Sequence, residues 1–220
     1  MPGFFELDGP RLDPQAGVKP DSLVLLLHGI GADGNDLIGL APYWTRALPR
    51  TAFVSPDAPF PCDMAPFGRQ WFSLQDRAPE AILAGVQAAA PVLDAFIDAE
   101  LARAGLAPDR LALVGFSQGT MMSLYVALRR PQAIAAVVGY SGALVAADRL
   151  AAEIKSRPPV LLVHGDADPV VPFAALAAAE RALTAAGVAV ETLACPGVPH
   201  SIDQAGLVRG GRFLAAKLGR

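Results

Sequence analysis

Short continuous runs of apolar residues recur along the chain, and most of them stop at a glycine or another turn-forming residue. Such runs are typical of strands that are buried on both faces of a parallel sheet. We expect strands at 23–27, 51–55, 111–115, 134–140 and 160–164. A sixth run, 188–193, alternates slightly between apolar and polar residues and would suit a strand nearer the edge of the sheet.

Between these runs, apolar residues recur at helical spacing. The clearest stretch carries Ile82, Val86, Leu93 and Ile97 near one stripe, ahead of the strand at 111–115. Pro91 lies inside this stretch, and because proline lacks an amide hydrogen we expect a kink or two abutting helices there. Further helices are expected at about 37–48, 118–129, 173–186 and 204–218.

Strands that alternate with helices predict an α/β protein with a mostly parallel sheet and helices on both faces, because parallel neighbours need crossover connections. The 220 residues fit one domain spanning 1–220, in which residues 1–21 form an N-terminal extension or a hairpin. In such sheets ligands bind beyond the carboxyl ends of the strands. The residues that directly follow each strand are therefore the candidates for chemistry.

Composition narrows the class of protein. A net charge of −3 without a basic run argues against nucleic acid as a partner. The N-terminal residues are acidic and rich in proline, unlike a signal peptide, and no later apolar run looks long enough to span a membrane. We therefore expect a cytoplasmic protein without stable membrane insertion. Cys62 and Cys195 are far apart and form no C-x-x-C pair, so we expect two reduced thiols and no metal site.

A candidate nucleophile follows the strand at 111–115. Gly115, Ser117 and Gly119 form a G-x-S-x-G pattern that leads into the helix at 118–129. This strand–turn–helix context is what a nucleophile elbow requires, because small flanking residues allow the sharp turn that exposes the serine hydroxyl. The alternative is a serine that merely caps the helix, since serine is favoured at helix starts.

A serine hydroxyl needs a base to take its proton, and the chain has three histidines. His28 and His164 stand at strand ends before a glycine, where a histidine usually packs and shapes the loop. His200 lies after the last expected strand and before the last expected helix, as a base on a loop would. We therefore assign the base to His200.

The third member of the triad should be a carboxylate between the serine and the histidine in chain order. The loop after 160–164 offers Asp166 and Asp168. We favour Asp168, because Pro169 stiffens the turn that follows and the loop has by then left the strand. Asp166 remains the alternative, although it suits a turn-capping role.

An acyl-transfer intermediate also needs donors for its oxyanion. The amide of Gln118, directly after the candidate nucleophile, is one. The glycine-rich loop after the strand at 23–27 should supply the other, and Ile30 is the candidate. The same glycines could cradle a phosphate, but the loop lacks the Lys-Ser/Thr ending of a P-loop and has no G-x-G-x-x-G spacing.

Six blocks in chain order resemble the phospholipase/carboxylesterase family of small α/β-hydrolases, which includes acyl-protein thioesterases and lysophospholipases. The blocks are 27–36, 56–59, 69–72, 115–119, 164–172 and His200. The resemblance implies an α/β-hydrolase fold without a large lid domain. It also implies Ser117, Asp168 and His200 as the triad, and the amides of Ile30 and Gln118 as the oxyanion hole.

The chain departs from many relatives at Ser73, where they carry an acidic residue, which puts substrate preference in doubt. The segment 57–79 is rich in proline and aromatic residues, and we hypothesise that Trp71 and Phe72 form a wall of an acyl pocket. Gly31 and Val171 are further expected substrate-binding residues. The alternative is a surface loop that tucks its aromatic rings into the core.

Together these features predict a serine hydrolase that cleaves carboxylic esters, with lysophospholipids and acyl thioesters as further substrates, through an acyl-enzyme and without metal or cofactor. An acyltransferase or peroxide-using enzyme on the same triad is an alternative, as is a catalytically silent ligand-binding relative. The sequence leaves open the acyl length, the leaving group and the oligomeric state, a homodimer included.

Overall fold

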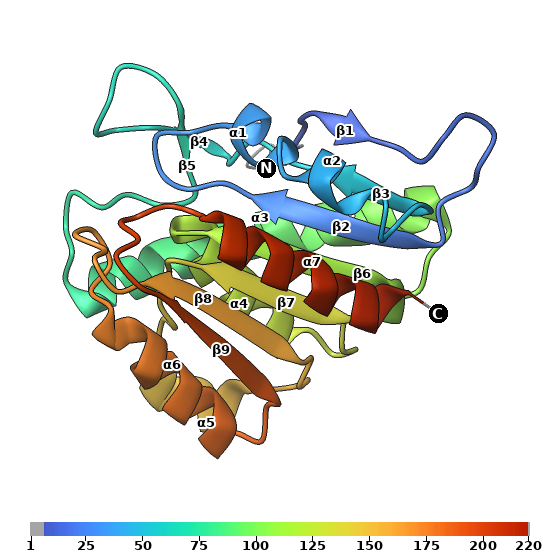
Figure 1. Ribbon diagram of the computed structural model, residues 1–220. Coiled ribbons are helices and arrows are strands. Elements are labelled where there is room, and N and C mark those ends of the chain that lie inside the picture. The colour runs from blue at the N-terminus through green and yellow to red at the C-terminus, as the bar shows by residue number, and fades with distance from the viewer. Residues whose placement is uncertain (1–6, 220) are drawn as a thin grey trace.

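The computed structural model describes residues 7–219 and is built on a seven-stranded sheet in the order β1-β3-β2-β6-β7-β8-β9 (Figure 1). Six strands are parallel: β2 (Ser22–Leu27), β3 (Thr51–Val54), β6 (Leu111–Phe116), β7 (Ala136–Tyr140), β8 (Val160–Gly165) and β9 (Val190–Cys195). They confirm the six expected runs, and β9 lies at the sheet edge as expected.

The N-terminal segment adds one strand. β1 (Arg11–Leu12) pairs antiparallel with β3 and forms the other edge of the sheet. The described part of residues 1–21 thus joins the sheet beside β3. Its first six residues lie outside the described part of the chain.

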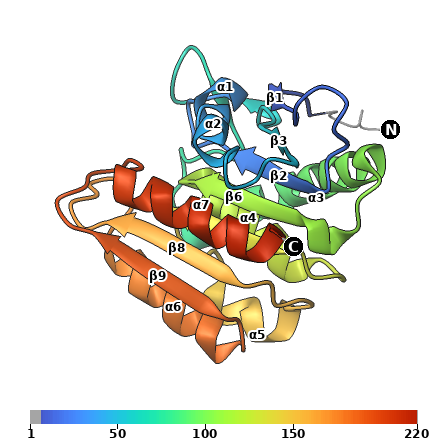
Figure 2. The ribbon, with the colours of Figure 1, turned by 45° about the vertical axis from the view of Figure 1, so that its right-hand side comes forward.

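Helices cover both faces of the sheet (Figures 1 and 2). One face carries α1 (Gly34–Ile38), α2 (Ala41–Trp44) and α7 (Gln204–Leu218). The other carries α3 (Pro79–Ala104), α4 (Gln118–Arg129), α5 (Leu150–Glu153) and α6 (Ala174–Ala185). Two short 3₁₀ helices, η1 (Pro108–Arg110) and η2 (Ala147–Arg149), complete the connections. This arrangement confirms the expected α/β class with a mostly parallel sheet.

Strand β2 shows why the apolar runs are continuous. Leu23, Leu25 and Leu27 face the core beneath α3 and α4, whereas Val24 and Leu26 face the core beneath α7. Because successive side chains point to opposite faces, a strand covered on both faces needs apolar residues at every position.

The expectation of one helix at 37–48 is wrong, because two short helices occupy this segment. α1 ends at Ile38, and Pro42 stands in the first turn of α2. Proline has no amide hydrogen to donate to the carbonyl of Ile38, so it fits a helix start but not a helix interior.

Helix α3 runs without interruption across Pro91, so the alternative of two abutting helices is wrong. By length and composition alone α3 could also cross a membrane, with a mean hydropathy of 1.5 over its most apolar 18 residues, which corrects the expectation that no run is long enough. Val86, Leu93 and Ile97 are nevertheless fully buried against the sheet. One side of α3 therefore packs into the core, although only 33% of its most apolar 18 residues is buried.

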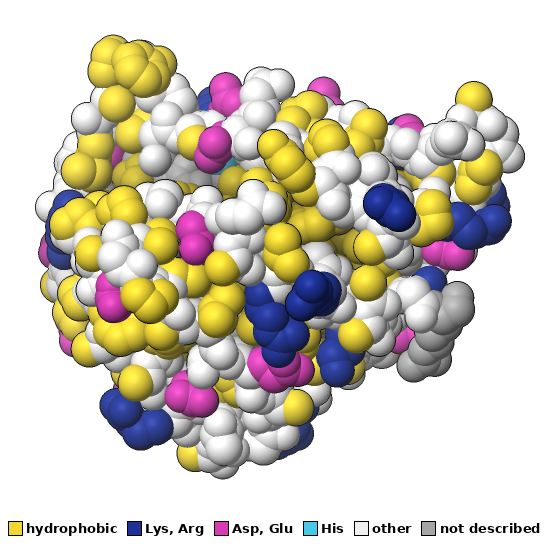
Figure 3. Space-filling view, in the orientation of Figure 1, with side chains coloured by type: hydrophobic (Ala, Val, Ile, Leu, Met, Phe, Trp, Pro, Cys, Tyr) yellow, Lys and Arg dark blue, Asp and Glu magenta, His cyan; other side chains and the backbone are white. Residues whose placement is uncertain are grey.

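A small hairpin, β4 (Phe60–Pro61) and β5 (Arg69–Gln70), was not expected from the sequence. It projects from the end of the molecule at which the parallel strands finish (Figure 1). Met64 and Phe67 lie in the loop that joins its two strands and are 53% and 74% exposed. Figure 3 shows apolar side chains gathered on this projection.

Candidate active site

Ser117 stands on a strained turn between β6 and α4. Its φ angle is +54°, a left-handed conformation that costs a non-glycine residue about 1–3 kcal/mol. The Ser117 amide donates to the carbonyl of Tyr140 (3.0 Å), which ties the turn to the neighbouring strand β7. The Ser117 side chain makes no capping hydrogen bond to α4, so the helix-capping alternative finds no support.

The two flanking glycines are dictated by contact. A Cβ atom on Gly115 would overlap the backbone of Gly119, and one on Gly119 would overlap the carbonyl oxygen of Leu27 at the end of β2. The strand, the turn and the first turn of α4 therefore pack backbone to backbone. This close approach explains the glycine spacing around Ser117.

Asp168 and His200 lie together, although they come from different loops. Nδ1 of His200 donates to Oδ2 of Asp168 at 2.7 Å. Oδ1 of Asp168 accepts from the amides of Val170 (2.8 Å) and Val171 (2.9 Å), which fixes the carboxylate in one orientation. With Nδ1 bearing the hydrogen, Nε2 of a neutral His200 is left with a free lone pair.

The surroundings of Asp168 keep it ionised. Burial acts to raise the pKa of this carboxyl group, but the hydrogen bonds from His200 and from the amides of Val171 and Val170 outweigh it. The net result is a pKa below the ordinary aspartate value.

Asp166 behaves differently. Its Oδ1 accepts from the amide of Gly197 at 2.6 Å, and the residue is exposed. It caps a turn between two loops, as the sequence suggested for it.

The other two histidines are fixed by the core. His28 accepts at Nε2 from the amide of Ala58 (3.0 Å), and burial lowers the pKa of its imidazole. His164 donates from Nε2 to the carbonyl of Val171 (3.0 Å) and lies beneath the Asp168 carboxylate, 3.3 Å from Oδ2. His200 is the one histidine of the three that reaches the surface, with 17% of its side chain exposed.

His200 also lies beside the elbow, since its ring centroid is 4.8 Å from that of Phe116, the residue before Ser117. Figure 3 shows a histidine side chain in a hollow next to the projecting hairpin, bordered by apolar and acidic side chains.

The amides of Ile30 and Gln118 are the predicted oxyanion donors. Within the described residues, neither Ile30 nor Gln118 donates its amide to a backbone carbonyl. The loop that carries Ile30 approaches the elbow closely, since a Cβ atom on Gly29 would lie 3.3 Å from Cβ of Ser117. An amide that has no backbone acceptor and lies close to the nucleophile in the fold is a candidate donor to an oxyanion.

The expected acyl wall of Trp71 and Phe72 needs correction. Both side chains lie in the core, with 0% and 2% of their surface exposed. The alternative, aromatic rings tucked inward from a surface segment, describes them better. Gly31 keeps open space around its α-carbon, whereas Val171 is nearly buried and engages Asp168 through its amide.

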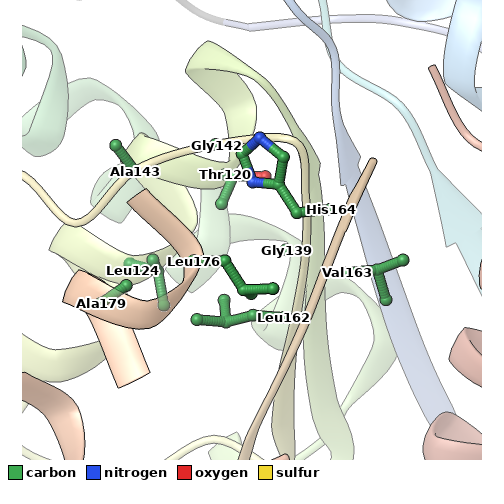
Figure 4. Close-up of a pocket in the computed structure, with 10 residues that line it drawn as sticks. All are labelled: Thr120, Leu124, Gly139, Gly142, Ala143, Leu162, Val163, His164, Leu176 and Ala179. Atoms are coloured by element: carbon green, nitrogen blue, oxygen red, sulfur yellow. The ribbon is translucent and has the colours of Figure 1, made fainter. Parts of the chain in front are cut away.

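A cavity beneath the elbow is too small for an acyl chain. It measures about 10 Å³, roughly the least that holds one water molecule. His164 points into it towards Thr120 and Gly142, and Leu124, Leu162 and Leu176 form its apolar side (Figure 4). This cavity therefore does not serve as an acyl pocket.

The described residues also include possible metal ligands and thiols, namely histidine, carboxylate and cysteine side chains. Across residues 7–219 no cluster of three histidine, cysteine or carboxylate side chains is arranged to hold a metal ion. Both cysteines are free, and burial together with Asp203 raises the pKa of the Cys195 thiol to about 11.

The sheet, the glycine-flanked elbow and the Asp168–His200 pair define the class: the chain has the α/β-hydrolase fold of esterases and thioesterases. Residues 14–218 match the family described as Phospholipase/Carboxylesterase. The chain belongs to this family, as its sequence motifs suggested, and it is a hydrolase.

Individual relatives agree. The chain is 30% identical to "Esterase YpfH" of Escherichia coli (strain K12) over 86% of its own length and 80% of the relative. It is 32% identical to "Acyl-protein thioesterase 1" of Schizosaccharomyces pombe over 70% of this chain and 72% of the relative. Among solved structures, that of esterase PE8 matches with a TM-score of 0.92 at 45% identity, covering 97% of this chain and all of that one. Two of these relatives are named esterases and one is named an acyl-protein thioesterase.

Sequence reasoning missed two side chains near the elbow. Gln118 was singled out only for its amide, and Arg69 only as part of a family block, yet both make hydrogen bonds across the site. Such bonds join residues distant in the chain, and no local pattern signals them.

Proposed function

We propose that the protein hydrolyses carboxylic esters and thioesters through an acyl-enzyme formed on Ser117. The observation that carries the proposal is the 2.7 Å hydrogen bond from Nδ1 of His200 to the buried carboxylate of Asp168, in a loop beside the strained turn of Ser117. A serine on such a turn next to an oriented imidazole is suited to acyl transfer.

In the first half-reaction the Ser117 hydroxyl attacks the substrate carbonyl as Nε2 of His200 takes its proton. Asp168 holds the tautomer that exposes Nε2 and stabilises the imidazolium ion. The amides of Ile30 and Gln118 donate to the oxyanion of the tetrahedral intermediate. When this intermediate collapses, the bond to the leaving group breaks, and His200 returns the proton to the departing alcohol or thiol.

In the second half-reaction water replaces the alcohol. His200 removes a proton from the water as its oxygen attacks the acyl-serine carbonyl, and the same amides stabilise the second oxyanion. Collapse releases the carboxylic acid and returns the proton to Ser117. Every proton is carried by His200, so the cycle needs no metal or redox cofactor.

The names of the relatives guide the choice of substrate. One is an esterase and another an acyl-protein thioesterase. Small neutral esters and acyl thioesters are therefore the first substrates to test, with lysophospholipids as a further class.

The test is hydrolysis of p-nitrophenyl butyrate by the wild type, by Ser117→Ala and by Ser123→Ala. Ser123 is a matched control, because it is a fully buried serine in α4 whose hydroxyl bonds to the carbonyl of Gly119. We expect Ser117→Ala to lose at least about 1000-fold in kcat and Ser123→Ala to stay within about threefold. Wild-type activity in Ser117→Ala, or a fluorophosphonate that fails to label Ser117 in the wild type, would overturn the proposal.

We extend the proposal to a cytoplasmic location. The two cysteines are both free, which suits a reducing compartment. Cell fractionation with an antibody against the protein tests this, and recovery in an extracellular or membrane fraction would contradict it.

A further inference from the structure

The two proposed oxyanion donors belong to different parts of the chain. Ile30 lies in the loop after β2, and Gln118 begins α4 after β6. An oxyanion hole works only when both donors lie within hydrogen-bonding distance of the oxyanion. The separation of the Ile30 loop and the start of α4 must therefore be fixed by contacts in the protein. Residues 68–72, which contain β5 and the segment after it, contact both.

The contact with the Ile30 loop is backbone to backbone. The amide of Gly31 donates to the carbonyl of Arg69 (2.8 Å), and the amide of Arg69 donates to the carbonyl of Ala32 (2.7 Å). Gly68 lies so close that a Cβ atom on it would overlap the carbonyl of Gly31. The peptide that follows Ile30 is thereby held by Arg69.

The side chain of Arg69 fixes the position of this segment. Its Nε donates to the carbonyl of Ala58 (2.8 Å) and its Nη2 to that of Pro59 (2.9 Å). Ala58 in turn donates its amide to His28, at the start of the Ile30 loop. A planar guanidinium can hold two carbonyls at once in a way that a lysine ammonium cannot reproduce.

The contact with the elbow uses the side chain of Gln118, which is fully buried. Its Oε1 accepts from the amide of Trp71 (3.1 Å), and its Nε2 donates to the carbonyl of Phe72 (2.8 Å). Trp71 also contacts the Ile30 loop, because its ring Nε1 donates to the carbonyl of His28 (3.0 Å). The buried residues Trp71 and Phe72 thus hold the Gln118 side chain through their backbone groups.

We propose that residues 68–72 act as a brace that sets the separation of the Ile30 and Gln118 amides, with Arg69 and the Gln118 side chain as positioning residues. This inference rests on the proposed esterase function. Loss of the brace moves donors that act on the oxyanion and leaves ground-state binding of the ester nearly unchanged. The effect therefore falls on kcat and on transition-state analogues, while KM changes little.

The first test compares Arg69→Lys with Arg110→Lys. Arg110 is a matched control, because its Nε and Nη2 also donate to two backbone carbonyls, those of Asp21 and Leu218, and it directly precedes β6, at the opposite end of that strand from Ser117. With p-nitrophenyl butyrate we expect Arg69→Lys to lose about 10- to 100-fold in kcat with KM within about twofold. Arg110→Lys should keep the wild-type kcat. A boronic acid that forms a tetrahedral adduct with Ser117 should bind Arg69→Lys more weakly by a factor similar to the loss in kcat.

A second pair covers the case in which Arg69→Lys folds poorly. Gly68→Ala and Gly17→Ala both place alanine at a left-handed φ, +81° and +83°, but only Gly68 faces a neighbouring backbone, that of Gly31. Gly68→Ala should therefore lose kcat, and Gly17→Ala should not.

Two results would overturn the brace: a wild-type kcat in Arg69→Lys or Gly68→Ala, or a loss shared equally by the control variants. Failure of the esterase proposal looks different, because the wild type itself would then neither hydrolyse the ester nor react with a fluorophosphonate at Ser117.

Discussion

Nδ1 of His200 donates to Oδ2 of Asp168 across 32 positions of the chain. The Asp168 side chain is fully buried, whereas 17% of the His200 side chain is exposed. A buried carboxylate beneath a partly exposed imidazole can orient the ring while the other ring nitrogen faces substrate and water. Asp166, two residues earlier, bonds a backbone amide of Gly197 and makes no such pair.

This relationship predicts different outcomes for the two aspartates. Asp168→Asn should lower kcat for p-nitrophenyl butyrate by about 1000- to 10,000-fold, because the amide favours the wrong imidazole tautomer. Asp166→Asn should stay within about threefold, since it touches only a turn. Steady-state kinetics on both purified variants checks this. Equal losses in the two variants would contradict the assignment of Asp168.

The lowered pKa of Asp168 predicts how stability depends on pH. The folded-state pKa lies below the ordinary value of 3.8, so the stabilisation by the ionised form is fully present above about pH 5 and is lost as pH falls through the folded pKa. The difference in unfolding free energy between wild type and Asp168→Asn should shrink as pH falls from about 5 to about 3. Urea titrations at these pH values measure it. A difference that grows in acid would contradict the assigned direction of the pKa shift.

Some parts of the site could be predicted because they follow from strand ends. Ser117, Asp168 and His200 each stand in a loop after a parallel strand, and such loops gather at one edge of the sheet. Local residue types were enough for this, since the glycines at 115 and 119 are needed for backbone contacts that any such elbow makes.

Other parts could not be predicted, because burial and long-range hydrogen bonds decide them. An aromatic side chain in a proline-rich segment can line a pocket or enter the core, and Trp71 enters the core because its Nε1 finds the carbonyl of His28. The strands of the β4–β5 hairpin are too short to show an alternation of apolar and polar residues in the sequence. The break between α1 and α2 was readable in principle from Pro42, which the helical spacing at 37–48 obscured.

The burial of Trp71 predicts that replacing it lowers the unfolding free energy by about as much as replacing Trp44. Trp44 is also buried and donates its Nε1 to a backbone carbonyl, that of Leu207, on the opposite face of the sheet. Trp71→Phe and Trp44→Phe should each cost about 1–3 kcal/mol in unfolding free energy. Neither should change the dependence of rate on acyl length across a series of p-nitrophenyl esters. A shift in chain-length preference in Trp71→Phe alone would return this residue to the acyl pocket.

Substitution of Gly119 in the elbow should cause the largest loss of unfolding free energy among the variants proposed for the site. An alanine at 119 would drive its Cβ into the carbonyl oxygen of Leu27, and because both partners are backbone the collision is relieved only by separating α4 from β2. Gly119→Ala should therefore lose at least about 3 kcal/mol in unfolding free energy and nearly all esterase activity. Gly39→Ala is the control, since φ there is −60° and the added carbon would lie 3.4 Å from the carbonyl of Asp36, an ordinary contact. Urea unfolding of the two variants separates these cases, and a Gly119→Ala protein as stable as Gly39→Ala would show that the elbow does not pack against β2 as described.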